Sequence, residues 1–232
     1  MKAELIDVMG DDLRVANAAR VSFDKETDWD TVYDDGDKDL AVRDQKLINY
    51  LATHGHWTPF AHVQITMRET VPIFVARQRF KHMVGFTYNE VSRRYVDDTP
   101  EFYMPDVWRK RAENKKQGSS DEAVDNPRIG GLYEAFVETA NSLYEVFLVE
   151  GVAPEQARML LPQSMYTSYY VTGSLAAWAR AYSQRIHEHA QKEIQDLAKQ
   201  WDDIISNITE IKYSWGALAH ATKEGSVKED CI

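Results

Sequence analysis

The segment Pro72–Val96 concentrates side chains that could bind a multiply charged anion. The only acid among its cationic residues is Glu90, and the cations are Arg77, Arg79, Lys81, Arg93 and Arg94. Guanidinium groups bind phosphate oxygens in a bidentate manner. The same segment carries groups that could orient a base or a sugar, namely Gln78, His82, Asn89 and Ser92. This pattern indicates a local site for a small phosphate-bearing ligand.

A second, dispersed set of cations lies nearer the end of the sequence and comprises Arg158, Arg180 and Arg185. Arg185 is surrounded along the chain by Trp178, Tyr182 and Ile186. An arginine on a partly apolar helix face needs an anionic partner nearby. We therefore expect Arg185 to face a charged or polarisable ligand.

Composition excludes several classes of protein. The 232 residues carry a formal net charge of −10, and an acidic chain lacks the basic footprint of a general nucleic-acid binder. No apolar run approaches the roughly 20 residues that a membrane span needs. The first residues, MKAELIDVMGDDLR, lack the apolar centre of a signal peptide, so we expect a cytoplasmic protein. The single cysteine, Cys231, is a poor candidate for a nucleophile.

Three familiar catalytic arrangements are not supported. The histidines His54, His56, His62 and His82 have neither cysteine partners nor an HExxH motif, so we expect no metal. Ser92 lies outside any GxSxG elbow and is followed by two arginines, which favours a phosphate or base contact. The sequence contains neither GxGxxG nor GxxxxGK[ST]. His56, in a tight aromatic loop, is typical of a group that hydrogen bonds or stacks at a pocket.

The elements that must position these residues begin with short alternating segments and one helix. Lys2–Val8 alternates weakly and predicts a strand, Asp24–Asp39 predicts a surface loop, and Asp39–Thr53 has helical spacing. Ala61–Val71 alternates as a strand, with Glu69 on the same face as Val63, Ile65 and Met67. Pro72 suits the first turn of a helix, with Thr70 as a possible cap. That helix is interrupted at Gly85–Asn89, and Val91–Val96 is expected to be extended.

The second half is predicted to be mainly helical. Residues 109–128 are polar and charged, and we expect a mobile excursion there. An amphipathic helix with Leu132, Phe136, Ala140, Leu143 and Phe147 follows and ends at Gly151. A short helix starts at Pro154, Gln163–Thr172 is extended, and Ser174 caps one long helix that runs past Trp201. The pattern predicts an α+β fold, a small antiparallel sheet flanked by long helices, with residues 1–232 in a single domain.

Seven fragments together resemble the flavin-dependent thymidylate synthases, the ThyX family. Each fragment alone is weak, but their order and spacing along most of the chain are specific. They are Ala18–Ser22 (AARVS), His56–Phe60 (HWTPF), Pro72–Gln78 (PIFVARQ), Tyr88–Tyr95 (YNEVSRRY), Glu101–Pro105 (EFYMP), Ala157–Pro162 (ARMLLP) and His189–Gln195 (HAQKEIQ).

The resemblance implies reductive methylation of dUMP to dTMP, with methylenetetrahydrofolate as carbon donor and FAD reduced by NADPH. It also implies a homotetramer with active sites between subunits. Arg185 takes the place of the catalytic arginine that polarises the uracil ring. The implied dUMP contacts are Gln78, Arg79, Lys81, Glu90, Ser92, Arg93, Arg94, Arg158 and Arg185. The implied FAD contacts are Ser22, His56, Thr58, Lys81, His82, Met83, Glu90, Ser174 and Arg180.

Three departures from the family pattern concern the cofactor. The family hallmark is Arg-His-Arg followed by seven residues and a serine, whereas here eight residues separate Lys81-His82-Met83 from Ser92. Lysine keeps the charge without the guanidinium fork, and methionine loses the cation. Ser174 and Arg180 stand where the family usually has asparagine, and Arg79 is a candidate to compensate for Met83.

Two other functions remain open at this point. A metal-dependent pyrophosphohydrolase would need acidic residues clustered at helical spacing, which the arginine-rich segment lacks. A non-catalytic relative that binds dUMP or flavin is motivated by Met83.

Overall fold

The computed structural model describes residues 1–31, 38–96, 98–113 and 118–225, and within these ranges it describes the side chains up to residue 219 except those of residues 31 and 38. Four antiparallel strands form the central sheet in the order β1-β4-β8-β5. They are β1 (Lys2–Met9), β4 (Gln64–Pro72), β5 (Phe86–Glu90) and β8 (Tyr166–Ser174). Two short pairs lie outside this sheet, β2 (Asp30–Thr31) with β3 (Lys38–Asp39) and β6 (Arg109–Arg111) with β7 (Ser119–Ala123). The predicted α+β class is confirmed.

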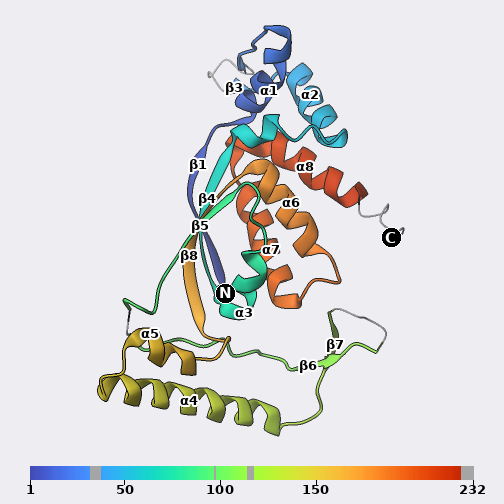
Figure 1. Ribbon diagram of the computed structural model, residues 1–232. Coiled ribbons are helices and arrows are strands. Elements are labelled where there is room, and N and C mark those ends of the chain that lie inside the picture. The colour runs from blue at the N-terminus through green and yellow to red at the C-terminus, as the bar shows by residue number, and fades with distance from the viewer. Residues whose placement is uncertain (32–37, 97, 114–117, 226–232) are drawn as a thin grey trace.

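Helices cover one face of the sheet and both of its ends (Figure 1). The covering helices are α3 (Ile73–Arg79), α6 (Leu175–Ile186), α7 (Lys192–Ser206) and α8 (Lys212–Gly225). At one end lie α1 (Asp12–Arg20) and α2 (Val42–Thr53), with the 3-10 turns η1 (Val21–Phe23) and η2 (Pro59–His62). At the other end lie α4 (Arg128–Val149), α5 (Pro154–Ala157) and η3 (Arg158–Leu160), and η4 (Thr209–Ile211) precedes α8.

The strand alternation predicted for β4 is confirmed and defines the core. Val63, Ile65, Met67 and Glu69 are fully buried, whereas Arg68 is exposed. Met67 pairs with Val171 and Glu69 with Tyr169 on β8, so these inward positions are opposite one another. Trp178 of α6 and Trp201 of α7 pack on them with their rings 5.6 Å apart.

Strand β5 begins where the sequence predicted only an interruption. The extended segment is Phe86–Glu90 rather than Val91–Val96, because Phe86 and Tyr88 pack against the core when they pair with β8. Gly85 supplies the turn before it with a φ of +80°. Gly173 allows the close approach, since a Cβ there would lie 2.3 Å from the Phe86 ring. Thr70 does not cap α3: its hydroxyl bonds Ser168, and Pro72 takes the cap position.

The single long helix predicted from Ser174 past Trp201 is wrong, because two helices occupy this stretch. Ser174 does cap α6 by accepting from the amide of Ala177 at 3.2 Å. The helix ends at Ile186 and α7 starts at Lys192. Ala190 is the only apolar residue between them, so nothing continues the buried side of the helix. The break allows residues on both sides of it to turn toward α3.

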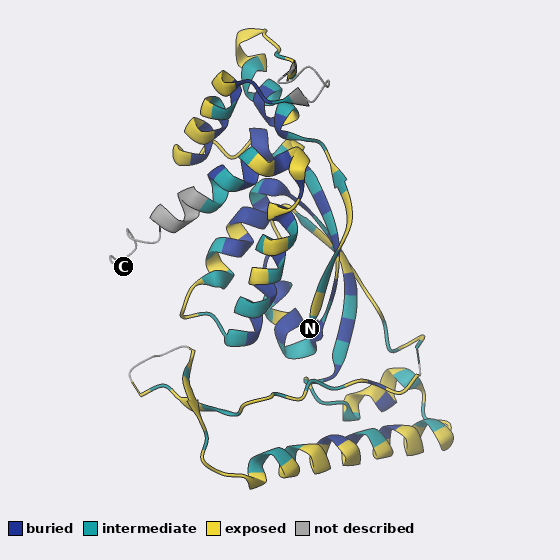
Figure 2. Ribbon diagram, turned by 180° about the vertical axis from the view of Figure 1, so that it is seen from behind, coloured by how far each residue is buried: buried dark blue, intermediate teal, exposed yellow. Residues whose placement is uncertain are grey.

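Helix α4 spans the predicted stretch, but its main apolar stripe faces outward (Figure 2). Leu132, Phe136 and Leu143 are 69, 55 and 45 % exposed, and the buried residues are Val137, Ala140 and Tyr144. Of the predicted excursion at 109–128, residues 109–111 and 119–123 pair as a hairpin, while 114–117 lie outside the described residues. Its mobility stays a prediction. No helix in the described part of the chain is long and apolar enough to cross a membrane.

Candidate active site

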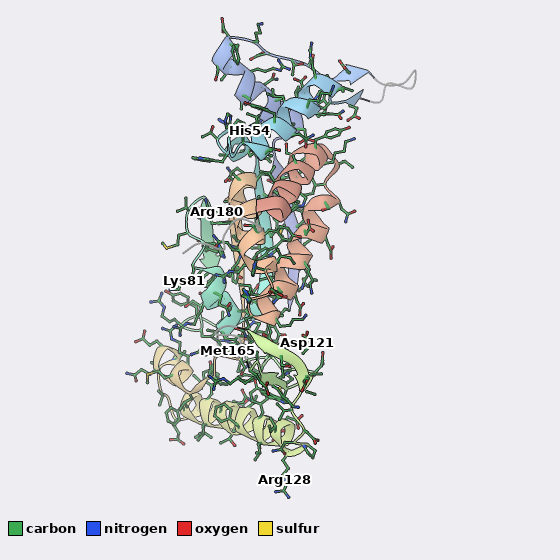
Figure 3. The ribbon with its side chains drawn as sticks, turned by 90° about the vertical axis from the view of Figure 1, so that its right-hand side faces the viewer. His54, Lys81, Asp121, Arg128, Met165 and Arg180 are labelled. Atoms are coloured by element: carbon green, nitrogen blue, oxygen red, sulfur yellow. The ribbon has the colours of Figure 1, made fainter. Side chains whose placement is uncertain are left out.

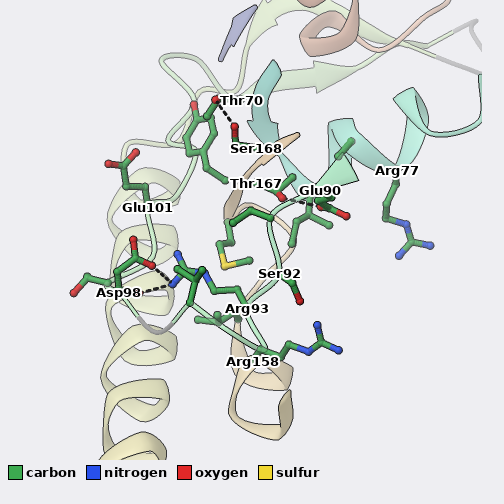
Figure 4. Close-up of a pocket in the computed structure, with 18 of the residues that line it drawn as sticks. Thr70, Arg77, Glu90, Ser92, Arg93, Asp98, Glu101, Arg158, Thr167 and Ser168 are labelled. Carbon is green, nitrogen blue, oxygen red and sulfur yellow. Dashed lines mark hydrogen bonds and ion pairs between the residues drawn. The ribbon is translucent and has the colours of Figure 1, made fainter. Parts of the chain in front are cut away.

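A pocket of about 830 Å³ opens between α3, β5, η3 and the start of β8 (Figure 4). It gathers four of the residues predicted to bind dUMP: Glu90, Ser92, Arg93 and Arg158. Glu90, Ser92 and Arg93 are neighbours in the sequence, whereas Arg158 is distant, so the fold brings Arg158 to the other three. The remaining lining includes Arg77, Glu101, Thr167 and Ser168.

Hydrogen bonds hold two acidic residues of the pocket, Glu90 and Asp98, and the exposed cations Arg77 and Arg158 also belong to its lining. Thr167 donates to Glu90 Oε1 at 2.7 Å, and Arg93 Nη1 pairs with Asp98 Oδ1 at 2.7 Å. Arg77 and Arg158 are exposed, and Figure 4 shows their guanidinium groups extended beyond Ser92. Such an arrangement can hold a dianion between two guanidinium groups and a serine hydroxyl.

Arg185 lies outside the pocket lining, in a group of residues with His82 and Gln78. Its Nε donates to Nε2 of His82 at 2.8 Å, and its Nη2 donates to the carbonyl of Gln78 at 3.0 Å. Burial, followed by the nearby charge of Arg79, lowers the pKa of Arg185. Burial and the charges of Arg185, Arg79 and Arg180 lower the pKa of His82 to about 4. His82 is therefore neutral at pH 7, and its ring nitrogen can accept the hydrogen bond.

The segment that follows His82 is attached to α6. Arg180 donates to the carbonyl of Val84, and the amide of Ser174 donates to the carbonyl of Gly85 at 3.1 Å. Lys81 and Met83 point away from the core, and Met83 is 74 % exposed. Figure 3 places Lys81 and Arg180 on the same side of the molecule, with Met165 of the pocket beyond Lys81. The predicted flavin contacts Lys81, His82, Met83 and Arg180 thus lie in one region.

Arg79 requires a correction, because it points into the core and away from the pocket. Its side chain is fully buried, its Nε lies 3.2 Å from Glu69 Oε1, and its Nη1 donates to Tyr88 at 2.6 Å. Its guanidinium carbon lies 4.3, 4.8 and 4.7 Å from the ring centres of Phe86, Trp178 and Trp201. Arg79 can neither contact a substrate phosphate nor replace the missing cation at Met83. The inward position predicted for Glu69 was the available signal, since a buried acid needs a buried cation.

The other predicted positions are more scattered. Ser22, His56 and Thr58 are exposed, and His56 packs edge-on against Tyr50 with ring centres 6.0 Å apart. Ser174 is buried, and its hydroxyl caps α6. Arg94 is exposed, and its guanidinium lies 5.1 Å from the ring centre of Tyr95, outside the pocket lining.

Sequence reasoning did not assign several residues of the site. Arg77 was recognised as part of a basic cluster but received no role, and Thr167 was noted only as part of an extended stretch. The position of Thr167 near the start of a strand was the available signal, because strand ends commonly line pockets. The spacing of the sequence gives no signal that Arg109 pairs with Glu193 or that Gln191 pairs with Gln78.

Comparisons with known proteins place the chain in a family. The family model described as "Thymidylate synthase complementing protein" matches residues 4–209. The chain is 39 % identical over 214 residues to the flavin-dependent thymidylate synthase of Thermosipho africanus, covering 91 % of this chain and 86 % of that one. It is 35 % identical over 223 residues to the Thermus thermophilus enzyme of the same name, and the match covers 96 % of this chain and 77 % of that one. The chain belongs to the thymidylate synthase complementing protein family.

Solved structures agree with this assignment. The UMP/dUMP methylase PolB from Streptomyces cacaoi superimposes with a TM-score of 0.78 in its complex with 5-Br dUMP, at 28 % identity over 94 % of each chain. Its complex with 5-Br UMP gives a TM-score of 0.79. The activity of the family is that of flavin-dependent thymidylate synthases, methyltransferases that convert dUMP to dTMP. The family, fold class and activity predicted from the sequence are confirmed.

Proposed function

We propose that the chain makes dTMP from dUMP with methylenetetrahydrofolate as carbon donor, and with FAD reduced by NADPH as its cofactor. The observation that carries the proposal is the pocket that unites Glu90, Ser92, Arg93 and Arg158. Arg158 and Arg77 supply charge for the 5′-phosphate, Ser92 adds a hydroxyl, and Glu90 accepts a sugar hydroxyl. Phosphate binding by paired guanidinium groups also explains how an acidic chain holds an anionic substrate.

Arg185 activates the pyrimidine in this proposal. Its guanidinium is held by His82 and by the carbonyl of Gln78, so its orientation is set before substrate binds. A desolvated cation beside N3 and O2 stabilises the negative charge that develops when C5 becomes nucleophilic. Neutral His82 contributes by accepting the hydrogen bond from Arg185 Nε, and it adds no second positive charge.

Two sets of exposed residues fit an anionic, aromatic cofactor such as FAD. Lys81 and Arg180 are exposed cations in one region, and His56 and Trp57 are exposed rings in the separate loop before η2. When bound, the flavin supplies the reducing equivalents of the reaction. Lys81 would bind its phosphates and His56 would contact a ring. Ser174 contributes least, because its hydroxyl is used as a helix cap.

We also propose a homotetramer in the cytoplasm. Arg185 and its partners His82 and Gln78 are not among the residues that line the pocket, and a second copy of the chain can bring the two groups together. The exposed apolar residues of α4 support such contacts, since patches of this kind commonly mark interfaces.

The test is a visible spectrum of the purified protein with FAD and then dUMP, followed by tritium release from C5 of labelled dUMP. Flavin bands that shift on adding dUMP, together with tritium release, are expected. Arg158→Ala should raise KM for dUMP about tenfold or more, as loss of a charge-assisted hydrogen bond does. Arg128→Ala, an exposed arginine at the start of α4, is the matched control and should change nothing (Figure 3). Flavin and dUMP binding without tritium release would instead identify a non-catalytic binder.

UMP is a second candidate substrate, because both PolB structures are described as those of a UMP/dUMP methylase. Competition of unlabelled UMP against labelled dUMP measures this directly. Equal inhibition by UMP and dUMP would extend the substrate to ribonucleotides, and absence of inhibition would restrict it to dUMP.

A further inference from the structure

A chain of four polar side chains connects the β6–β7 hairpin to α3. Arg109 Nη2 donates to Glu193 Oε1 at 2.5 Å, and Gln191 Nε2 donates to Glu193 Oε2 at 2.8 Å. Gln78 Nε2 then donates to Gln191 Oε1 at 2.5 Å. The four residues come from β6, the start of α7 and α3, and the hairpin ties to Glu193 through a charge pair. We call this chain of contacts the polar relay.

The chemistry of Arg109 and Glu193 sets the direction of every hydrogen bond in the polar relay. Arg109 can only donate, and the Glu193 carboxylate can only accept. Gln191 must therefore turn its amide nitrogen toward Glu193, which leaves its oxygen for Gln78. Gln78 must in turn use its nitrogen here, so its Oε1 points away from the relay.

The polar relay is well placed to hold that orientation. Glu193 is only 5 % exposed and lies in the first turn of α7, where a helix favours negative charge. The Arg109 side chain is 22 % exposed, so the ion pair is partly shielded from water. Within the described part of the chain, Oε1 of Gln78 receives no hydrogen bond, while its backbone carbonyl holds Arg185.

We propose that Glu193 is a positioning residue that sets the polarity of Gln78, so that Gln78 presents a hydrogen-bond acceptor to dUMP. The proposal rests on the proposed function, in which Gln78 contacts dUMP next to Arg185. The donors that dUMP offers are the ring N3–H and the 3′-hydroxyl. A Gln78 held with its oxygen outward accepts from one of them, whereas a reversed Gln78 would oppose it with an N–H.

Glu193→Gln tests the polarity with almost no change of shape. Arg109 still demands an oxygen, so the new amide turns its nitrogen toward Gln191. Gln191 then reverses, and Gln78 must turn its oxygen toward Gln191 and its N–H toward the substrate. All three hydrogen bonds of the polar relay survive; the bond from Arg109 keeps its direction, and the other two are inverted.

The double variant Gln191→Glu with Glu193→Gln should restore the original direction of the hydrogen bond made by Gln78. The carboxylate now at 191 accepts from Gln78 and from the amide at 193, whose oxygen accepts from Arg109. The double variant also has the net charge of the original protein. Glu122→Gln is the matched control, because Glu122 pairs with Lys110 at 2.9 Å on the exposed side of the same hairpin.

The measurement is the Kd for dUMP of the flavin-loaded protein, with flavin uptake and Tm recorded for each variant. Glu193→Gln should weaken dUMP binding about tenfold or more, because the N–H of Gln78 would then face a hydrogen-bond donor of dUMP. Flavin uptake should be unchanged. The double variant should recover most of that loss, and Glu122→Gln should match the original protein. An unchanged Kd in Glu193→Gln, or equal loss in the single and double variants, would overturn the proposal.

Failure of the proposed function has a different signature. If the original protein binds no dUMP, the nucleotide assignment fails, and the inference that depends on it falls with it. If the original protein binds dUMP and Glu193→Gln binds it equally well, only the polarity inference fails.

Discussion

Replacing Arg79 by methionine removes a positive charge from the centre of the core and keeps a side chain of similar length. The substitution leaves Glu69 with Tyr169, whose hydroxyl donates to Glu69 Oε2 at 2.5 Å, but without a counter-ion. Both Arg79 and Glu69 are fully buried. Tyr88 also loses the hydrogen bond that it receives from Arg79 at 2.6 Å.

The expected loss follows from this burial. Breaking a buried ion pair by removing one partner costs about 3–5 kcal/mol. A chain of this size loses roughly 2–4 °C of Tm for each kcal/mol, so we expect Arg79→Met to melt about 6–20 °C lower. The guanidinium also lies over three aromatic rings, which adds to the loss rather than offsetting it.

Thermal and urea unfolding, followed by circular dichroism, measure the effect. The double variant Arg79→Met with Glu69→Gln should recover much of the stability, because a neutral pair replaces the uncompensated carboxylate. A loss below about 1 kcal/mol in the single variant would refute the reasoning, since that is the value of an exposed pair. Normal stability combined with weaker dUMP binding would return Arg79 to the substrate site.

Three further predictions concern the residues near Arg185. Arg185→Ala should keep flavin but lose about 2.7–4 kcal/mol of transition-state stabilisation in tritium release, and unchanged turnover would remove its catalytic role. The pKa of His82 is lowered from 6.5 to about 4 in the folded protein, so the unfolded chain binds the proton first as the pH falls. Stability should therefore drop between pH 6.5 and about 4, by up to ~1.4 kcal/mol per pH unit, and His82→Asn should flatten this part of the urea-midpoint profile. Met83→Arg should tighten FAD binding, because Met83 is 74 % exposed at the position where the sequence resemblance predicts a cation. A flavin Kd that stays the same or rises would mean that this chain builds its cofactor site differently.

Local patterns predicted the parts of the fold that depend on local rules. Alternation in β4 identified the inward face, including Glu69, and the serine before α6 identified its cap. Long-range pairing was harder, because Phe86–Glu90 becomes a strand only where Gly173 lets Phe86 approach β8. The apolar residues of α4 predicted the helix but not the direction of its apolar side, since amphipathicity does not say which surface will cover that side.

For the candidate site too, local patterns predicted which residues belong to it but not how tertiary packing orients them. Charge clustering found the arginines, and the family fragments assigned them roles, but neither could say which of them enters the core. Three consecutive residues of α3 point in three directions: Arg77 to the pocket, Gln78 to α7 and Arg79 to Glu69. A helix turns about 100° per residue, so neighbours in sequence must diverge in this way. The choice of the inward residue depends on the acid that β4 supplies.

Tyr88 connects the buried ion pair to the candidate site. It receives a hydrogen bond from Arg79 and donates to the carbonyl of His82 at 2.7 Å, while the His82 ring holds Arg185. Burial raises the pKa of Tyr88 to about 12, so its hydroxyl keeps the proton that it donates. His82 is thus fixed through its backbone by the core and through its ring by Arg185. Because one network serves both purposes, a change that loosens the Arg79–Glu69 pair should also misplace Arg185, and a loss of activity in Arg79→Met does not require contact between Arg79 and dUMP.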